Sequence, residues 1–293
     1  MITFICCSIK PSYAENLEKN IKETLGDMPF EFIAFDNREA KLGMCEVYNN
    51  NAEKSKYECL CFLHEDVKFL TNGWGHEIVR KLQEEDCGCI GFAGSVIKMS
   101  HPSGWYLNNQ NTRHHYRQLY VNVDKKPSNK RRNPDGGDYS EVITLDGMAL
   151  FVSKKVWSQH KFDQDNLRDF HCYDIDFTIN LARSGYKNYV TNLLYLEHFS
   201  DGNFSERWRD DTLKLHDKWK EHLPLYASSL DKRYLKRYLP KAYYSSIKTV
   251  LKYDLYTGTP KKEILEHMKR NPLKLSSWKL IRLYSKYKSK YEM

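Results

Sequence analysis

Short apolar runs alternate with segments of helical pattern over roughly the first 200 residues of the chain. The runs are continuous and rich in strand-forming residues, which is typical of strands buried on both faces. The first helical segment has Ser12 as its cap and Gly26 as its stop. The pattern predicts strands over 2–9, 30–35, 58–63, 88–93 and 189–196, regular structure over 142–151, and helices over 13–25, 45–56, 74–85, 153–159 and 173–184.

Strands that alternate with helices of about ten residues imply crossover connections. The predicted fold class is therefore α/β, with a mostly parallel sheet flanked by helices. The rhythm is lost over 98–140, a polar stretch with a basic run and a cluster of turn residues. This stretch is predicted to be a long loop, and long loops in compact domains are often functional. Beyond about Leu223 the pattern predicts short basic helices that are broken at Pro240, 258–260 and Pro272.

The composition favours a folded protein of the cell interior. Of the 293 residues, 41% are hydrophobic and 29% are charged, which suits a folded soluble chain rather than a disordered one. No apolar run approaches the ~20 residues of a membrane-spanning helix, and the first residues lack the basic lead-in of a secretory signal. The 8 cysteines form no Cys-x-x-Cys pair and lie mostly in apolar runs. Reduced, buried thiols and a cytoplasmic location are expected, rather than a disulfide framework or a zinc ribbon.

Positive charge is concentrated at the carboxyl-terminal end. Residues 231–293 hold 17 Lys and Arg against 5 Asp and Glu, a net charge of +12, whereas the remainder has 29 against 33, a net charge of −4. The same segment contains 9 of the 21 tyrosines. Two interpretations stay open: the segment docks on an anionic membrane surface, or its helices pack against the rest of the chain with a solvated basic face. Nucleic-acid binding is a weaker rival, because it leaves the acidic remainder unexplained.

Polar side chains follow three of the predicted strands. Asp36 ends the second strand, His64-Glu65-Asp66 ends the third, and His198 comes shortly after the last. In open α/β sheets, ligands bind at the carboxyl ends of the strands. Two carboxylates beside an imidazole can hold a divalent cation whose shell is completed by phosphates. The alternative is a solvated turn at the end of a strand.

A second candidate lies at the start of a predicted helix. Asp174 and Asp176 open the helix over 173–184, where a carboxylate can be aimed by the backbone and can take a proton from a hydroxyl group. The two side chains are about 200° apart on a helix, so both cannot face one ligand. Alternatively, both are acids of the first turn that stabilise the helix. Motifs of dinucleotide oxidoreductases, P-loop enzymes and α/β serine hydrolases are absent from the sequence.

The run from Tyr48 to Val67 resembles a segment of family 2 glycosyltransferases, in which an Asn-bearing helix precedes an apolar strand that ends in an Asp-x-Asp metal motif. Asn49 matches the asparagine and Asp66 the last aspartate, whereas His64 stands in place of the first aspartate. This departure leaves open whether His64 binds the nucleotide or only packs.

The run over 173–186 is similar to the family's Glu-Asp-x-Asp motif, which opens a helix and continues to Arg-x-Gly-Tyr. Asp174 then matches the catalytic base, and Tyr173 replaces the glutamate. His198 resembles the additional metal ligand that many GT-A enzymes carry after a late strand. If these matches hold, Asp66 and Asp174 must face one cleft.

The resemblance implies further contacts, first with the nucleotide of a donor and second with the sugar or the acceptor. The nucleotide group is Asp36, Asn49, His64 and Glu65, and the sugar or acceptor group is Trp105, Asp146, Gly147 and Asp176. The matches run in order over about 1–202 and are nearest to the streptomycin-biosynthesis-type domain. They imply a GT-A catalytic domain over 1–222, with 98–140 as an acceptor wall or lid, and a basic helical extension over 223–293.

The implied activity is transfer of a sugar, with inversion, from a nucleoside-diphosphate donor to a hydroxyl acceptor. Asp66 and His198 would hold Mn²⁺ or Mg²⁺ against the diphosphate, and Asp174 would deprotonate the acceptor. The acceptor would be a glycan or a lipid-linked intermediate of a surface polysaccharide, met at the inner face of the membrane. The alternatives are a nucleotidyltransferase, which needs a further basic phosphate site, and a non-catalytic sugar-binding relative, which would suit His64 and Tyr173.

Overall fold

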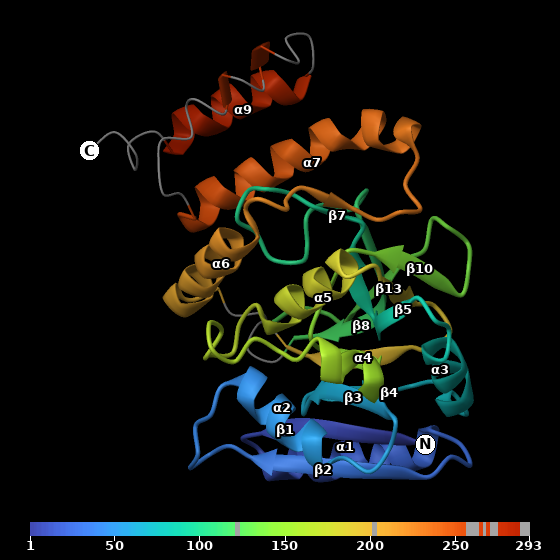
Figure 1. Cartoon of the computed structure of the whole chain (residues 1–293). Helices are drawn as coiled ribbons and strands as arrows, with labels where there is room; N and C mark the ends of the chain where they lie inside the picture. The colour runs from blue at the N-terminus through green and yellow to red at the C-terminus, as the bar shows by residue number, and fades with distance from the viewer. Residues whose placement is uncertain (121–123, 201–203, 256–263, 266–267, 270–274, 288–293) are drawn as a thin grey trace.

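A computed structural model describes residues 1–120, 124–200, 204–255, 264–265, 268–269 and 275–287 (Figure 1). The described strands are β1 (Ile2–Ser8), β2 (Phe30–Asp36), β3 (Cys59–His64), β4 (Val67–Phe69), β5 (Cys87–Gly91), β6 (Ala93–Ser95), β7 (Ile97–Lys98), β8 (Thr112–Leu119), β9 (Ser128–Arg132), β10 (Tyr139–Val142), β11 (Thr144–Leu145), β12 (Ala149–Ser153), β13 (Lys187–Thr191), β14 (Leu196–Phe199) and β15 (Leu225–Tyr226). The helices are α1 (Pro11–Thr24), α2 (Met44–Lys54), α3 (Gly75–Leu82), α4 (Lys154–Gln159), α5 (Tyr173–Arg183), α6 (Glu206–Trp219), α7 (Lys232–Tyr253) and α9 (Leu275–Tyr287).

The central sheet has seven strands in the order β10-β13-β5-β12-β3-β1-β2. Strands β2, β1, β3, β5 and β13 run in one direction, and β12 and β10 run against them. Helices cover both faces of this sheet (Figure 1). The predicted α/β class with a mostly parallel sheet is therefore confirmed.

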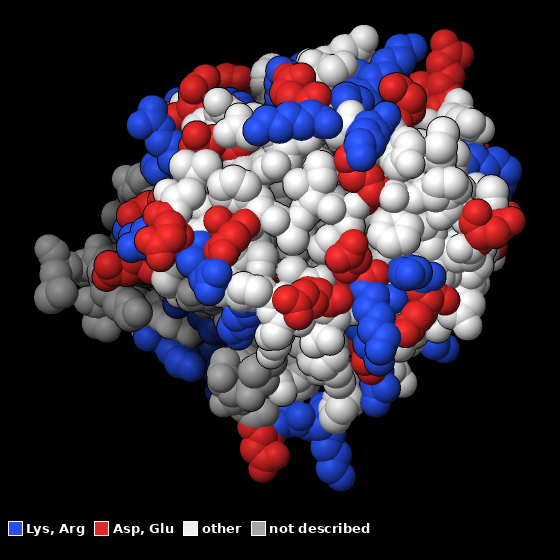
Figure 2. Space-filling model, turned by 90° about the horizontal axis from the view of Figure 1, so that it is seen from below, with Lys and Arg blue, Asp and Glu red and all other residues white. Residues whose placement is uncertain are grey.

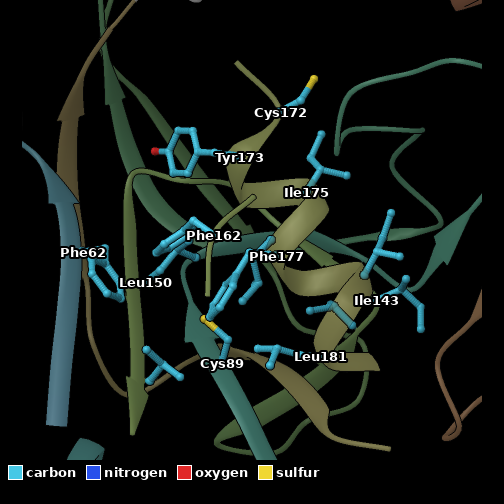
Figure 3. Packing of buried hydrophobic residues seen from close by; sticks show 14 of the residues in the cluster. Phe62, Cys89, Ile143, Leu150, Phe162, Cys172, Tyr173, Ile175, Phe177 and Leu181 are labelled. Carbon is cyan, nitrogen blue, oxygen red and sulfur yellow. The ribbon is translucent and has the colours of Figure 1, made fainter. Parts of the chain in front are cut away.

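Successive residues of β3 enter two different hydrophobic clusters, because side chains alternate across a strand. Cys61 and Leu63 pack with α1 and α3, whereas Phe62 packs with α2 and α5. Figure 3 shows the cluster that contains Phe62, in which Phe162 and Phe177 stack with ring centroids 4.4 Å apart. Burial on both faces explains why the strands are continuous apolar runs in the sequence.

A second sheet corrects the prediction of a long loop over 98–140. Its order is β11-β6-β8-β14-β4, with β9 paired to β8, so much of the predicted loop is strand. The sequence does not predict β8 and β9 because both strands are polar, and their charged side chains find partners only in the folded protein. The nearly fully buried guanidinium of Arg113 on β8, for example, forms an ion pair with Asp135, with Nε 2.7 Å from Oδ2. The predicted strand over 189–196 is also two strands, β13 and β14, which belong to different sheets.

Two predictions about helix ends are wrong. Helix α1 begins at Pro11 rather than after a Ser12 cap, because proline has no N–H to lose at the first helical position. Helix α7 continues through Pro240 without a break. Its buried face, which includes Ile247 and Leu251, offsets the backbone hydrogen bond that proline cannot make. The breaks predicted at 258–260 and Pro272 lie outside the described residues.

The helices α7 and α9 lie at the end of the molecule opposite to β1 and β2, and α6 lies below α7, beside α5 (Figure 1). Helix α7 packs against the preceding chain, where the buried Ser246 hydroxyl lies 3.0 Å from Nδ1 of His101. At the end of the molecule that holds β1 and β2, the surface shows Lys, Arg, Asp and Glu intermixed (Figure 2). Within the described part of the chain, no helix is long and apolar enough to cross a membrane. The predicted division at residue 222 and the predicted membrane contact of 231–293 stay predictions.

Candidate active site

Three potential metal ligands meet where the two sheets adjoin. His64 ends β3 of the central sheet, and Asp66 lies in the turn that leads to β4 of the second sheet. Strand β14 pairs with β4 so that His198 lies opposite Val67, and the N–H of Phe199 donates to the Asp66 carbonyl over 2.9 Å. One ligand atom from each of His64, Asp66 and His198 lies within 4.8 Å of the others. Strand pairing therefore gathers side chains that are far apart in the sequence.

Two of the facing atoms of this cluster lack hydrogen-bond partners among the described residues. Asp66 Oδ1 lies 3.6 Å from His198 Nε2 and 3.9 Å from His64 Nδ1. Both Asp66 Oδ1 and His198 Nε2 are buried without a hydrogen bond. Burial raises the pKa of Asp66 to about 6, and burial together with the neighbouring His64 lowers the pKa of His198 to about 3. An acceptor oxygen and a neutral imidazole nitrogen that face each other unpaired fit a divalent cation between them.

His64 and Tyr173, the two residues that differ from the family motifs, are in contact with each other. His64 Nε2 lies 2.8 Å from the Tyr173 hydroxyl, which donates to the carbonyl of Gly147 over 3.2 Å. With the hydroxyl proton directed to Gly147, the His64 tautomer that fits is the one in which Nε2–H donates to the Tyr173 oxygen. The lone pair of Nδ1 is then free on the side of Asp66. A Cβ atom on Gly147 would lie only 2.2 Å from the Tyr173 oxygen, so this close approach requires glycine. In this position Nδ1 of His64 faces Asp66 and His198, and a role for His64 toward the nucleotide stays a prediction.

Asp174 lies in the first turn of α5, which follows Cys172 in a left-handed conformation (φ 65°). Its two carboxylate oxygens each accept a backbone hydrogen bond of 2.8 Å, from the N–H groups of Gly147 and Ile175. Burial, and then the charge of Asp146, raise its pKa to about 7. These bonds fix the orientation of the carboxylate, and the raised pKa suits a group that accepts a proton near neutral pH.

Asp66 and Asp174 line the same cleft, which has a volume of about 1080 Å³. The cleft is thus the shared space that the sequence motifs require. Six more of the predicted site residues line it: His64, Glu65, Trp105, Asp146, Gly147 and His198.

Two of these residues organise the walls of the cleft. Glu65 accepts hydrogen bonds from the Ser8 hydroxyl (2.7 Å) and the Lys10 N–H (3.0 Å), which fixes the turn after β1. Burial raises the pKa of Asp146, and the neighbouring Trp105 side chain acts in the opposite direction. Trp105 lines the cleft and packs against both hydrophobic clusters, so packing holds its ring in place.

Three predicted site residues do not line the cleft, and two of them have structural partners in the protein interior. Asp176 accepts a 2.7 Å hydrogen bond from Trp219 Nε1 and pairs with Lys218 at 2.8 Å, which ties α5 to α6. Asn49 donates to the Phe162 carbonyl over 2.9 Å. Both side chains are buried away from the cleft, which corrects the sugar or acceptor role expected for Asp176 and the nucleotide role expected for Asn49.

Asp36 is the third. It lies at the end of β2, exposed, and its carboxylate is 2.5 Å from Arg38, which lowers its pKa to about 2. The next residue, Asn37, lines the cleft instead. Asp36 is thus paired with Arg38 and is not among the residues that line the cleft, and its contact with the nucleotide stays a prediction.

The cleft also has walls that sequence reasoning missed. Phe170 and His171 come from the segment before α5, and Lys248, Lys252 and Tyr253 come from α7. The segment before α5 carries no motif. The basic, tyrosine-rich composition of α7 was visible in the sequence, but nothing local indicated that this helix folds back onto the cleft.

Comparisons with known proteins agree with the motifs. A family model described as a glycosyltransferase-like family matches residues 3–219. No curated protein sequence matches the chain. Among solved structures, the chain is similar to GalNAc-T7 with UDP, GalNAc and Mn²⁺, at 12% identity and a TM-score of 0.46, over 99% of this chain and 51% of that one. It therefore spans about half the length of that protein.

Two further structures are of similar likeness. One is the mannosyltransferase PcManGT from Pyrobaculum calidifontis in complex with GDP-Man and Mn²⁺, at 11% identity and a TM-score of 0.48, over 98% of this chain and 84% of that one. The other is TarS 1–349 from S. aureus, at 9% identity and a TM-score of 0.48, over 94% and 77%. The family match includes both carboxylate motifs and most of the chain, so the protein belongs to the glycosyltransferase-like family, as its motifs and its GT-A type of α/β fold predict.

Proposed function

We propose that this glycosyltransferase moves a sugar from a nucleoside-diphosphate donor to a hydroxyl group of an acceptor, in a metal-dependent reaction with inversion. The observation that carries the proposal is the shared cleft of Asp66 and Asp174. One carboxylate belongs to a cluster with unpaired ligand atoms, and the other is held by two backbone N–H groups. This arrangement supports a cation site and a separate base site within one cavity.

His64, Asp66 and His198 would hold the cation. Two imidazole nitrogens and one carboxylate oxygen suit Mn²⁺ better than Mg²⁺, which prefers oxygen ligands. When bound, the cation supplies Lewis-acid stabilisation of the charge that develops on the leaving diphosphate. Tyr173 supports the site because its hydroxyl fixes the tautomer of His64.

Asp174 would accept the proton of the acceptor hydroxyl as the oxygen attacks the anomeric carbon. The new carbon–oxygen bond forms on the face opposite to the breaking bond, the bonding electrons leave with the diphosphate, and the configuration inverts. The backbone N–H of Gly147 holds Asp174 in place. Trp105 lines the same cleft, and an aromatic ring can stack on the face of a sugar.

The test is a screen of nucleotide-sugar donors, in which release of the nucleoside diphosphate is measured with Mn²⁺ and with EDTA. We expect turnover only with Mn²⁺, and its loss in Asp66→Asn and in Asp174→Asn. Asp217→Asn is the matched control, because this carboxylate is exposed on α6 and is not among the residues that line the cleft. Turnover in EDTA, or near-wild-type turnover in either cleft variant, contradicts the proposal.

A further inference from the structure

One wall of the cleft comes from outside the region that defines the family. The family match ends at residue 219, whereas α7 spans Lys232–Tyr253 and contributes cleft-lining side chains over two of its turns. These side chains are Ser245, Lys248, Thr249, Lys252 and Tyr253. The selectivity of this wall is therefore a property of this chain and cannot be inferred from the family match.

The α7 wall carries positive charge. Lys248 and Lys252 are four residues apart, so they project from the same face of the helix, and Arg207 on α6 lines the same cleft. Among the described residues, Lys248 has no ion pair or hydrogen bond, and Lys252 contacts only Tyr253, with Nζ 2.8 Å from the hydroxyl. The nearest carboxylate to Arg207 is Asp169, at 4.0 Å. Lys248 and Lys252 thus have no carboxylate partner among the described residues, and the ion pair of Arg207 with Asp169 is long and exposed.

An aromatic cluster lies beside these cations. Phe204 and Tyr253 stack with ring centroids 4.7 Å apart, and Trp208 packs edge-on against both rings. Phe204 is 58% exposed, although it is a large apolar side chain. All three residues line the cleft. Cations next to an open ring face suit a ligand with an anionic group beside a sugar ring or an apolar chain.

The donor does not account for this second, positively charged subsite. A donor diphosphate would be drawn to the cation held by His64, Asp66 and His198, and that cluster is made by the ends of strands rather than by α7. Resting on the proposed function, we infer that the α7 wall binds the acceptor, and that this acceptor carries a phosphate group held by Lys248, Lys252 and Arg207. The acceptor is then a phosphorylated polyol or glycan, or a lipid phosphate.

The experiment measures phosphate binding while the donor site is filled. The full chain is saturated with Mn²⁺ and a nucleoside diphosphate (UDP and GDP are each tested), and glycerol 3-phosphate is titrated by calorimetry. A parallel arm uses phosphatidylcholine vesicles with and without phosphatidic acid. We expect Lys248→Gln/Lys252→Gln to weaken binding about tenfold or more, because two charge-assisted contacts are lost. The control Lys232→Gln/Lys236→Gln removes the same charge at the same spacing on α7, from exposed positions that are not among the cleft-lining residues.

The outcomes separate the two sources and the two proposals. Lysine-dependent binding of glycerol 3-phosphate indicates a soluble phosphorylated acceptor, and lysine-dependent binding of phosphatidic acid vesicles alone indicates a lipid phosphate. Equal binding by the cleft variant and the control, with melting temperatures unchanged, overturns the inference, as does a wild-type chain that binds neither probe. Failure of Mn²⁺-dependent nucleotide binding in the wild type counts against the proposed function instead, and it is measured first.

Discussion

Replacement of Asp174 by asparagine is expected to abolish sugar transfer and at the same time to stabilise the folded protein. Burial raises the pKa of Asp174 from an ordinary 3.8 to about 7, because the ionised carboxylate is disfavoured inside the protein. The folded state therefore holds this proton to a higher pH than the unfolded state does. As the pH rises from about 4 to about 7, the wild type loses stability at this site.

The size of the effect follows from the shift. About three pKa units at ~1.4 kcal/mol each give about 4 kcal/mol of lost stability at pH 8, of which only about 1.6 kcal/mol is already lost at pH 5. Asparagine carries no charge, but it also weakens the hydrogen bonds from Gly147 and Ile175. That loss is similar at both pH values. The stability gained by Asp174→Asn is therefore expected to be larger at pH 8 than at pH 5, by about 2–3 kcal/mol.

Urea unfolding followed by tryptophan fluorescence, in EDTA at pH 5 and pH 8, gives the free energies of unfolding. Asp217→Asn, at an exposed carboxylate of α6, is the control and should show the same small change at both pH values. The wild-type rate of sugar transfer should also rise with pH through about 7, since the base must be ionised to accept a proton. A gain that is equal at the two pH values, or larger at pH 5, refutes the reasoning about the burial of Asp174.

Three further substitutions test the surroundings of the site. Tyr173→Phe keeps the ring but frees His64 Nε2, and Mn²⁺ affinity measured by titration should fall about 10–100-fold with little change in melting temperature; unchanged affinity contradicts the tautomer argument. Gly147→Ala places a Cβ 2.2 Å from the Tyr173 hydroxyl, so both Mn²⁺ binding and transfer should be lost, and full activity would exclude the close approach. Trp219→Phe removes the hydrogen-bond donor to Asp176 and should lower the free energy of unfolding by about 1–3 kcal/mol. The KM values of the folded enzyme should stay unchanged, and a raised KM would indicate that Asp176 contributes to substrate binding.

Most strands of the central sheet were predictable because they are continuous apolar runs and the helices between them keep a regular apolar spacing. Strand β10 was not, because it begins in the polar stretch over 98–140. The second sheet was not predictable from the sequence. Its strand β8 reads Thr-Arg-His-His-Tyr-Arg-Gln-Leu, which has no apolar pattern, and its polar side chains find their partners only in the folded protein. The predicted break of α7 at Pro240 is wrong for a similar reason, because tertiary packing outweighs the low helix propensity of proline.

The candidate site was predictable only where a residue type and its place at the end of a strand or at the start of a helix define its role, as for Asp66 and Asp174. Asn49 and Asp176 belong to the same motifs, yet their side chains point to interior partners that the sequence does not name. The contact between His64 and Tyr173 spans 109 positions and joins two departures from one pattern. Such a pairing is a property of the tertiary structure, and one sequence by itself does not reveal it.

The most direct test of the account is the position of manganese in crystals grown with Mn²⁺ and a nucleoside diphosphate, found from its anomalous scattering. The account predicts a single strong peak bonded to His64, Asp66 and His198, inside the cleft that Asp174 lines. A nucleotide bound in the cleft with manganese held elsewhere, or with no manganese at these three side chains, would contradict it.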